Sequence, residues 1–260
     1  MLTTLASYAT ITADLPRSLG VTAAKPQVAR ETEYYLAHIE DVKTIDDFLG
    51  DDRVFAYAMK AFGLEDMAYA KAFMRKVLEG GIDKRDSFAN SLADQRYRDF
   101  VATFDFVRYE KTTTIFDRTR QGTVDRYVRQ TLEEDAGQEN EGVRLALYFE
   151  RRASGLVSAY GILADAALLK VAQTVLGIPA SASALDIDKQ AQIFSAKLDV
   201  EDLKDPEKLA RFLDRFATIW EMDHPSSAPA SPALLFSQPL ELGLGADLIA
   251  SLQNLKLGGR

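Results

Sequence analysis

The sequence contains no cysteine, only two histidines and one tryptophan, and no long run of apolar residues. The lack of cysteine excludes disulfide bonds, thiol catalysis and zinc sites with cysteine ligands. A membrane-spanning helix needs about 18 or more consecutive apolar residues, and no segment reaches that length. The first two dozen residues have neither a basic start nor a continuous apolar stretch, so we expect no Sec signal peptide and no membrane span.

The scarcity of histidine limits the metal sites that the chain can build. His224 follows Glu221 in a Glu-x-x-His pattern, which is half of a di-iron carboxylate site. The other half is missing, because the residue three positions before His38 is Tyr35. The sequence has neither a phosphate-binding loop nor a Gly-x-Ser-x-Gly nucleophile elbow. We therefore assign no catalytic, metal-binding or cofactor-binding residue and expect a protein that is not an enzyme.

Charged residues are abundant and mixed in sign. The chain has 31 Lys and Arg residues against 39 Asp and Glu residues, for a net charge of −8. This balance argues against general nucleic-acid binding, which requires a basic face. One segment, from residue 108 to residue 130, has more basic than acidic residues. Its basic residues are Arg108, Lys111, Arg118, Arg120, Arg126 and Arg129. Alternating charge of this kind favours a solvated helix face, and the alternative is a docking surface for an acidic partner.

Three consecutive acidic residues, Glu133, Glu134 and Asp135, follow this basic segment. Acidic side chains that converge could hold a metal ion or share a proton. Successive side chains on a helix point about 100° apart, so these three cannot converge on one point. We expect a solvated acidic helix end instead.

Part of the sequence recurs 114 residues further along the chain. Residues 48–51 (FLGD) match residues 162–165 (ILAD), and residues 62–64 (FGL) match residues 176–178 (LGI). Self-similarity at a fixed offset indicates two similar structural units. A repeat describes architecture and carries no chemistry of its own.

The ends of several helices can be read from local signals. Thr44 followed by Asp47 predicts a capping box, in which each side chain binds a backbone N–H of the other residue. Either Asp51 or Asp52 is predicted to cap the next helix, and Asp94 is predicted to cap the helix that follows it. Gly63 is predicted to end its helix, because glycine adopts a positive φ without steric cost.

Apolar residues recur at helical spacing through most of the chain, and no segment alternates as a strand does. We predict an all-α fold in which two pseudo-repeated helical clusters are joined by a long helical hairpin. The hairpin helices are expected from about Lys111 to Ala136 and over residues 141–160. The predicted units are a flexible arm or loosely packed helix (1–25), a first helical repeat (27–106), the hairpin (107–160), a second repeat (161–223), and a Pro/Ser-rich linker with a terminal amphipathic helix (224–260).

The terminal amphipathic helix carries the candidate partner-binding residues. Leu248, Ile249, Leu252 and Leu255 lie at positions i, i+1, i+4 and i+7, on one face of a helix. Such a face can pair with a helix of another protein or dock on the core of its own chain. Both alternatives are open from the sequence.

Five segments carry a family resemblance: DFL at 47–49, YAMKAFGLEDMAYAK at 57–71, SFANSLADQRY at 87–97, LALYF at 145–149 and ILAD at 162–165. Together they resemble the domain-of-unknown-function family 1217 over roughly residues 27–222. Members of this family are similar to proteins found among the flagellar genes of motile bacteria. The family has no established catalytic residues to transfer to this chain.

The resemblance implies a non-enzymatic structural or assembly protein associated with the bacterial flagellum. Its partners would be other proteins, flagellar components among them, and it would reside in the cytoplasm or be exported by the flagellar export apparatus. One alternative is a cytoplasmic helical adaptor or regulator of flagellar assembly that acts through the charged residues 108–141. Another is an enzyme or small-ligand binder, which would require a pocket of convergent polar groups.

Overall fold

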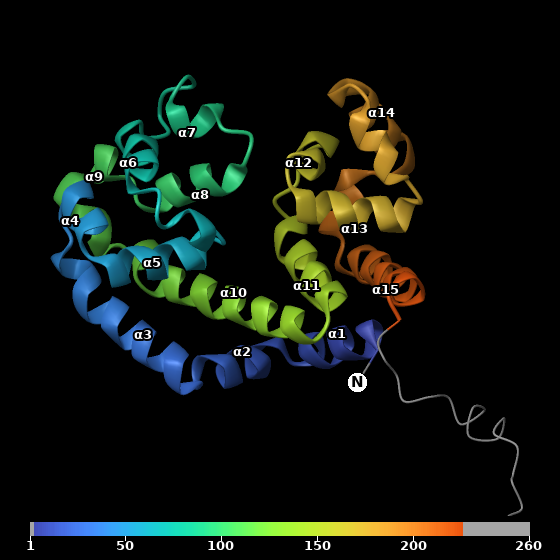
Figure 1. The fold of residues 1–260 in the computed structure, drawn as a ribbon, viewed down its shortest axis with the longest axis horizontal. Helices are drawn as coiled ribbons and strands as arrows, with labels where there is room; N and C mark the ends of the chain where they lie inside the picture. Colours follow the sequence, from blue (N-terminus) through green and yellow to red (C-terminus); the bar gives the residue numbers. More distant parts are fainter. Residues whose placement is uncertain (1–2, 226–260) are drawn as a thin grey trace, which may run out of the picture. The chain divides into compact units, whose positions relative to one another are not determined.

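The computed structural model describes residues 3–225, and every regular element in that range is helical (Figure 1). The predicted all-α fold class is confirmed. The helices up to residue 109 are α1 (Thr4–Ala13), α2 (Leu15–Ala23), α3 (Pro26–His38), α4 (Ile45–Gly50), α5 (Asp52–Ala61), α6 (Lys71–Glu79), α7 (Phe88–Ser91), α8 (Gln95–Thr103) and α9 (Phe106–Tyr109). Those that follow are α10 (Gln121–Glu139), α11 (Glu141–Ala153), α12 (Ala159–Leu163), α13 (Ala166–Leu176), α14 (Ile187–Lys197) and α15 (Pro206–Asp223).

The buried apolar side chains form two separate clusters, and we call the helices around them the first and second lobes. The first lobe, built from α3 to α10, has a core that runs in sequence from Val28 to Val128. The second lobe, built from α11 to α15, has a core from Val143 to Trp220, to which α1 adds Tyr8. The two lobes correspond to the left and right groups of helices in Figure 1.

The predicted hairpin is present, but its two helices belong to different lobes. Only Asn140 separates α10 from α11, and its side chain accepts a hydrogen bond from the backbone N–H of Gly142 (2.9 Å), which caps α11. The helices α10 and α11 pack against each other. On its other side, α10 contributes Val128 to the first core and α11 contributes Leu147 to the second. The hairpin therefore forms one wall of each lobe and joins the two.

The hairpin helices are shorter than predicted. The first begins at Gln121 rather than near Lys111, and the second ends at Ala153 rather than near residue 160. Residues 110–119 form two short 3-10 helices instead. Their buried hydroxyls donate hydrogen bonds to backbone carbonyls, and these hydroxyls belong to Thr113, Thr114 and Thr119. Threonine hydroxyls that bind the backbone in this way compete with the hydrogen bonds of an α-helix.

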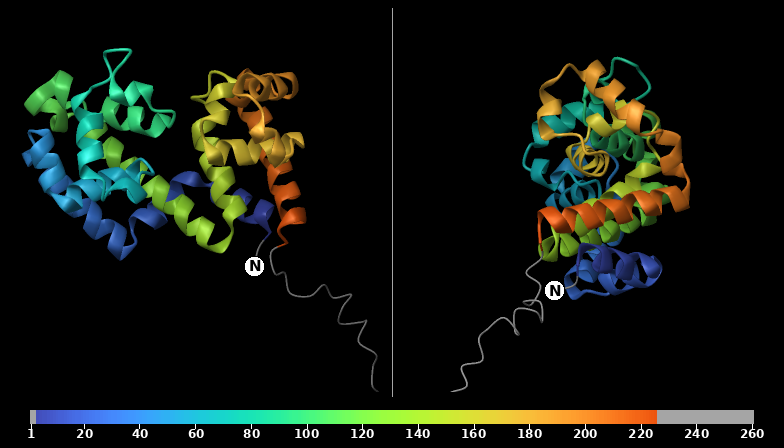
Figure 2. Two further views of the ribbon diagram at one scale, coloured as in Figure 1. Left: turned by 45° about the horizontal axis from the view of Figure 1, so that its top comes forward. Right: turned by 90° about the vertical axis from the view of Figure 1, so that its right-hand side faces the viewer.

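The N-terminal residues form two packed helices from Thr4 onward, so the helical alternative for this segment holds and the flexible arm does not (Figure 2). α1 packs on α11 and α15, and α2 packs on α10. Tyr8 and Thr22 are buried in these contacts. A few well-placed buried side chains therefore suffice to anchor this segment.

The helix ends predicted from caps and glycine are confirmed. Thr44 and Asp47 form the capping box, and the Asp51 side chain accepts hydrogen bonds from two N–H groups of α5, as Asp165 does for α13. Gly63 has φ +68° and Gly177 has φ +62°, where a Cβ would be strained. Matched features therefore occur at the predicted offset. The equivalence of the two lobes as whole repeats stays a prediction.

Gly142 allows α11 and α15 to approach closely. A Cβ built on it would lie 2.6 Å from Nε1 of Trp220 on α15, which is a severe overlap. We expect Gly142→Ala to destabilise the protein by about 1–3 kcal/mol, because the overlap outweighs alanine's advantage of about 1 kcal/mol within a helix. Chemical denaturation measures the change.

Gly20→Ala is the matched control for this substitution. Gly20 also lies within a helix, α2, but nothing lies within 4 Å of an added Cβ. This variant should gain about 0.5–1 kcal/mol. An equal gain in the free energy of unfolding for both variants would contradict the prediction, because it would show that α15 moves away from the added Cβ without cost.

Candidate functional site

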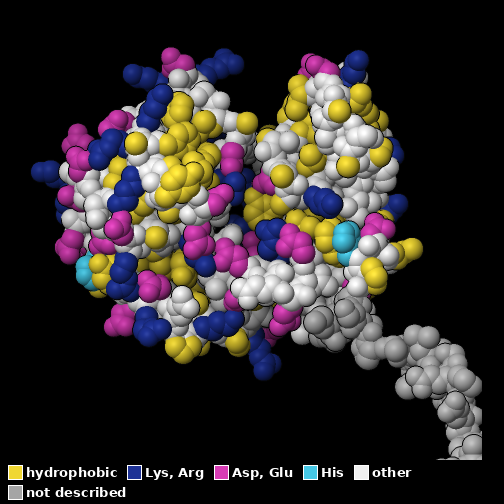
Figure 3. Space-filling view, viewed as in Figure 1, with side chains coloured by type: hydrophobic (Ala, Val, Ile, Leu, Met, Phe, Trp, Pro, Cys, Tyr) yellow, Lys and Arg dark blue, Asp and Glu magenta, His cyan; other side chains and the backbone are white. Residues whose placement is uncertain are grey.

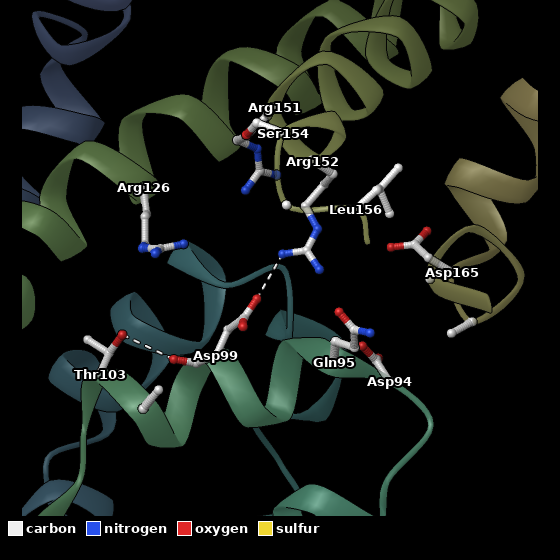
Figure 4. Close-up of a pocket in the computed structure, with 14 residues that line it drawn as sticks. Asp94, Gln95, Asp99, Thr103, Arg126, Arg151, Arg152, Ser154, Leu156 and Asp165 are labelled. Carbon is white, nitrogen blue, oxygen red and sulfur yellow. Dashed lines mark hydrogen bonds and ion pairs between the residues drawn. The ribbon is translucent and has the colours of Figure 1, made fainter. Parts of the chain in front are cut away.

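A polar cleft lies where the two lobes face each other. Its cavity of about 370 Å³ is bounded by α8 of the first lobe, by the hairpin, and by the segment from the end of α11 to the start of α13 (Figure 4). Acidic and basic side chains are interspersed on the face that carries the indentation between the lobes (Figure 3). The cleft brings together residues that are far apart in the sequence.

One ion pair joins the two lobes across this cleft. Arg152, in the last turn of α11, places its Nη1 2.8 Å from Oδ2 of Asp99 on α8. Burial lowers the pKa of Arg152, but the hydrogen bond and charge of Asp99, with the charges of Tyr148 and Asp165, raise it above its usual value overall. Arg152 therefore stays charged and fixes α8 to α11.

A buried ionic network joins the two hairpin helices next to the cleft. Glu133 on α10 is only 1% exposed, and its carboxylate binds both Arg129 (2.9 Å) and Arg151 (2.8 Å). Arg129 also donates to the Leu147 carbonyl (3.0 Å) and lies 3.3 Å from Glu150, both on α11. A carboxylate held by two guanidinium groups keeps the hairpin helices in one register and orients Arg151 at the edge of the cleft.

The carboxylates at the mouth of the cleft are also engaged. Asp94 caps α8 and binds the Arg96 guanidinium (2.7 Å), which reaches the carbonyl of Gly63 as well. Asp165 caps α13 and accepts a hydrogen bond from the Tyr148 hydroxyl (2.6 Å). Burial and the negative charge of Asp165 raise the pKa of Tyr148 well above its usual range.

Arg126 is different from the other cations of the cleft. Its guanidinium lies 4.8 Å from the centre of the Phe62 ring and points into the cavity from α10 (Figure 4). Among residues 3–225, no carboxylate lies within ion-pair distance of it and no hydrogen-bond acceptor engages it. Burial lowers its pKa, Asp99 opposes this, and Arg151 and Arg152 lower it further.

This arrangement is suited to holding charge rather than moving protons. General acid–base catalysis at neutral pH requires a group with a pKa near 7. The resolved shifts of Tyr148 and Arg152 lead away from neutrality, and an arginine such as Arg126 remains protonated in proteins. No His or Cys is among the described residues that line the cleft.

Residues 3–225 contain no group of three or more His, Cys, Asp and Glu side chains that could hold a metal ion. His224, the candidate half-motif, stacks on Trp220 at the end of α15 with a centroid distance of 4.0 Å. In the same range, none of the helices is both long enough and apolar enough to span a membrane.

The six basic residues of segment 108–130 do not form one surface. Four of them bind groups of the same chain: Arg108 lies near Asp83, Arg118 donates to the Thr103 carbonyl, Arg120 pairs with Glu40, and Arg129 pairs with Glu133. The expectation of a uniformly solvated face is wrong at Arg129, which is buried. Only Arg126 contributes to the cleft.

The three consecutive acidic residues diverge, as predicted, but they are not simply solvated. Glu133 is buried between two arginines, Glu134 binds Lys60 (2.8 Å), and Asp135 binds Lys25 (2.6 Å). The prediction of a solvated acidic helix end is therefore wrong for Glu133. The terminal candidates Leu248, Ile249, Leu252 and Leu255 lie outside the described residues.

Sequence reasoning gave no role to Tyr148, Arg151 or Arg152. One signal could have found part of the site. The pair Tyr148 and Asp165 repeats the pair Tyr34 and Asp51 at the same offset of 114, and each tyrosine donates to its aspartate, at 2.6 Å and 3.1 Å. A tyrosine that recurs 17 residues before the capping aspartate in both lobes indicates a polar contact between the two side chains.

Comparison with known proteins places the chain in a described group. The model of the family DUF1217, described as a protein of unknown function, matches residues 61–209. The crystal structure of protein AGR_C_984 from Agrobacterium tumefaciens is similar, with 46% sequence identity and a TM-score of 0.80. The match covers 85% of this chain and 94% of that one. Comparison with curated proteins gives no match.

Proposed function

The chain belongs to the DUF1217 family of proteins of unknown function, and on this premise we propose that it is a non-enzymatic structural or assembly protein associated with the bacterial flagellum. The resemblance of its motifs to proteins found among flagellar genes motivates the flagellar part of this proposal. Its partners are then other proteins, flagellar components among them. A likeness to a family supports a context and leaves the mechanism to the site.

The observation that carries the non-enzymatic part is the mutual neutralisation of charge around the cleft. Asp99, Asp94 and Glu133 are each bound by an arginine, and Asp165 is bound by Tyr148 and by backbone N–H groups. A carboxylate that is already bound by such donors is poorly placed to act as a general base. These bonds instead hold the lobes and the hairpin in a defined arrangement, which suits a structural role.

The second candidate is a cytoplasmic helical adaptor or regulator of flagellar assembly. The charged residues 108–141 motivate it, although Arg129 and Glu133 of that segment are committed to a buried network. Cellular location separates the two candidates, because an exported component leaves the cell through the flagellar export apparatus and an adaptor does not.

Fractionation of a motile host with an epitope-tagged chain tests the proposal. We expect tagged protein in the medium or in sheared flagellar fractions, and its loss when the export gate is disabled. A cytoplasmic enzyme serves as the lysis control. Protein confined to the cytoplasm in both strains would reject export and favour the adaptor. Unchanged motility on deletion, without co-purification of any flagellar component, would overturn the flagellar association itself.

A substitution in the terminal segment tests the candidate partner-binding face. If that face binds a partner, Leu252→Asp should abolish assembly and leave the melting temperature unchanged, because a charge cannot enter an apolar interface. Asn254→Asp adds the same charge away from the four apolar positions and should have no effect. A large fall in melting temperature for Leu252→Asp would show that the segment docks on its own chain.

A further inference from the structure

Three arginines and three aspartates line the cleft, and they differ in how fully the chain engages them. Arg126 carries five N–H donors, and within residues 3–225 its described neighbour is the Phe62 ring. Arg152 uses only Nη1 in its bond to Asp99, which leaves its other N–H groups available. The chain itself therefore supplies no acceptor for several charged donors that face the cavity.

The carboxylates that line the cavity are bound by groups other than Arg126. Asp99 is bound by Arg152, Asp94 is bound by Arg96, and Asp165 is bound by Tyr148 and by two backbone N–H groups. Glu133, which could neutralise a further cation, is already shared by two arginines. Because Arg126 is exposed, its hydrogen-bond acceptor is either water or a bound anion.

The positive charges near Arg126 favour an anion in the cavity. Its side chain is exposed, but partial desolvation and the charges of Arg151 and Arg152 lower its pKa, and a bound anion would offset this repulsion. A guanidinium offers two parallel N–H groups that match a carboxylate or a phosphate. A cavity of about 370 Å³ is large enough for a small molecule.

We propose that the cleft between the lobes binds a small anion with a carboxylate or phosphate group, held by the Arg126 guanidinium and by the free N–H groups of Arg152. The bound anion would contact α8, α10 and α11 together and so link the lobes. This anion site is independent of any flagellar association, because it depends only on the residues of the cleft.

Isothermal titration of the full chain at low ionic strength tests the site. The probes are inorganic phosphate and citrate, with sodium chloride at matched ionic strength as the reference. We expect saturable binding of at least one probe, and a loss of affinity of about tenfold or more in Arg126→Gln, because a charged hydrogen-bonded contact is removed. Arg126→Lys, which keeps the charge and loses the paired N–H groups, should lie between the two.

Arg98→Gln is the matched control. Arg98 is an exposed arginine on α8 that does not line the cavity, so its loss changes the net charge equally and should leave the affinity unchanged. Denaturation curves verify that each variant is folded. Binding of phosphate alone or citrate alone supports the site and identifies the group. The proposal is overturned if neither probe binds beyond chloride, or if Arg126→Gln binds as the wild type does.

Discussion

Replacing Glu133 with glutamine should destabilise the protein by about 3–5 kcal/mol, which is the usual cost of removing one partner from a buried ionic network. Glu133 is 1% exposed and holds Arg129 and Arg151 at 2.9 Å and 2.8 Å. Glutamine preserves the size of the side chain but removes the charge that Arg129 and Arg151 share, which leaves Arg129 with Glu150 as its carboxylate partner. Urea denaturation followed by circular dichroism measures the change in the free energy of unfolding.

The pair between Arg144 and Glu141 provides the control for the Glu133 prediction. It also joins an arginine to a glutamate, but it lies within α11 and its side chains are 36% and 48% exposed. Solvent screens such a pair, so Glu141→Gln should cost no more than about 0.5 kcal/mol. A similar small loss for Glu133→Gln would show that water reaches the network and that it is not buried in solution.

Phe48→Ala should destabilise the protein by about 3–5 kcal/mol, because it opens a cavity at the centre of the first lobe. The Phe48 ring is fully buried and lies 4.7 Å from the ring of Phe104 and 5.6 Å from those of Phe55 and Phe106, measured between centroids. These rings come from α4, α5, α9 and the end of α8. A single truncation therefore removes contacts from several helices at once.

Tyr69→Ala is the control for the truncation of Phe48. Tyr69 is also aromatic, but it is 83% exposed, and its loss should change the free energy of unfolding by no more than about 0.5 kcal/mol. Thermal or urea denaturation compares the two variants. A cost below about 1 kcal/mol for Phe48→Ala would mean that the surrounding rings collapse into the space, since collapse reduces the cavity penalty.

Local signals predicted the helix ends well. The capping box of Thr44 and Asp47, the cap at Asp51 and the positive φ of Gly63 all follow from hydrogen bonds and steric limits within a few residues. Such interactions are already specified by the sequence of neighbours. The all-α class follows in the same way from apolar spacing along the chain.

Local signals failed where a distant part of the chain decides the outcome. Residues 1–25 are predicted to form a flexible arm or a loosely packed helix, yet Thr4 binds Glu221 through its N–H (2.9 Å), more than two hundred positions away. The acidic helix end was expected to be solvated, yet Glu133 is buried and pairs with Arg151 on the other hairpin helix. Neither contact could be recognised from composition, because each depends on which helices the fold places side by side.

The sequence by itself determined the helices of this protein, many of their ends, and the recurrence of caps and glycines at an offset of 114. Only the tertiary structure decided that α10 and α11 divide between two cores, that Arg152 meets Asp99 from 53 positions away, and that Arg126 faces a cavity with no carboxylate partner among residues 3–225. The physical reason is the separation along the chain over which each interaction acts. Helix propensity and capping act between neighbours, whereas burial and ion pairing depend on the packing of the whole chain.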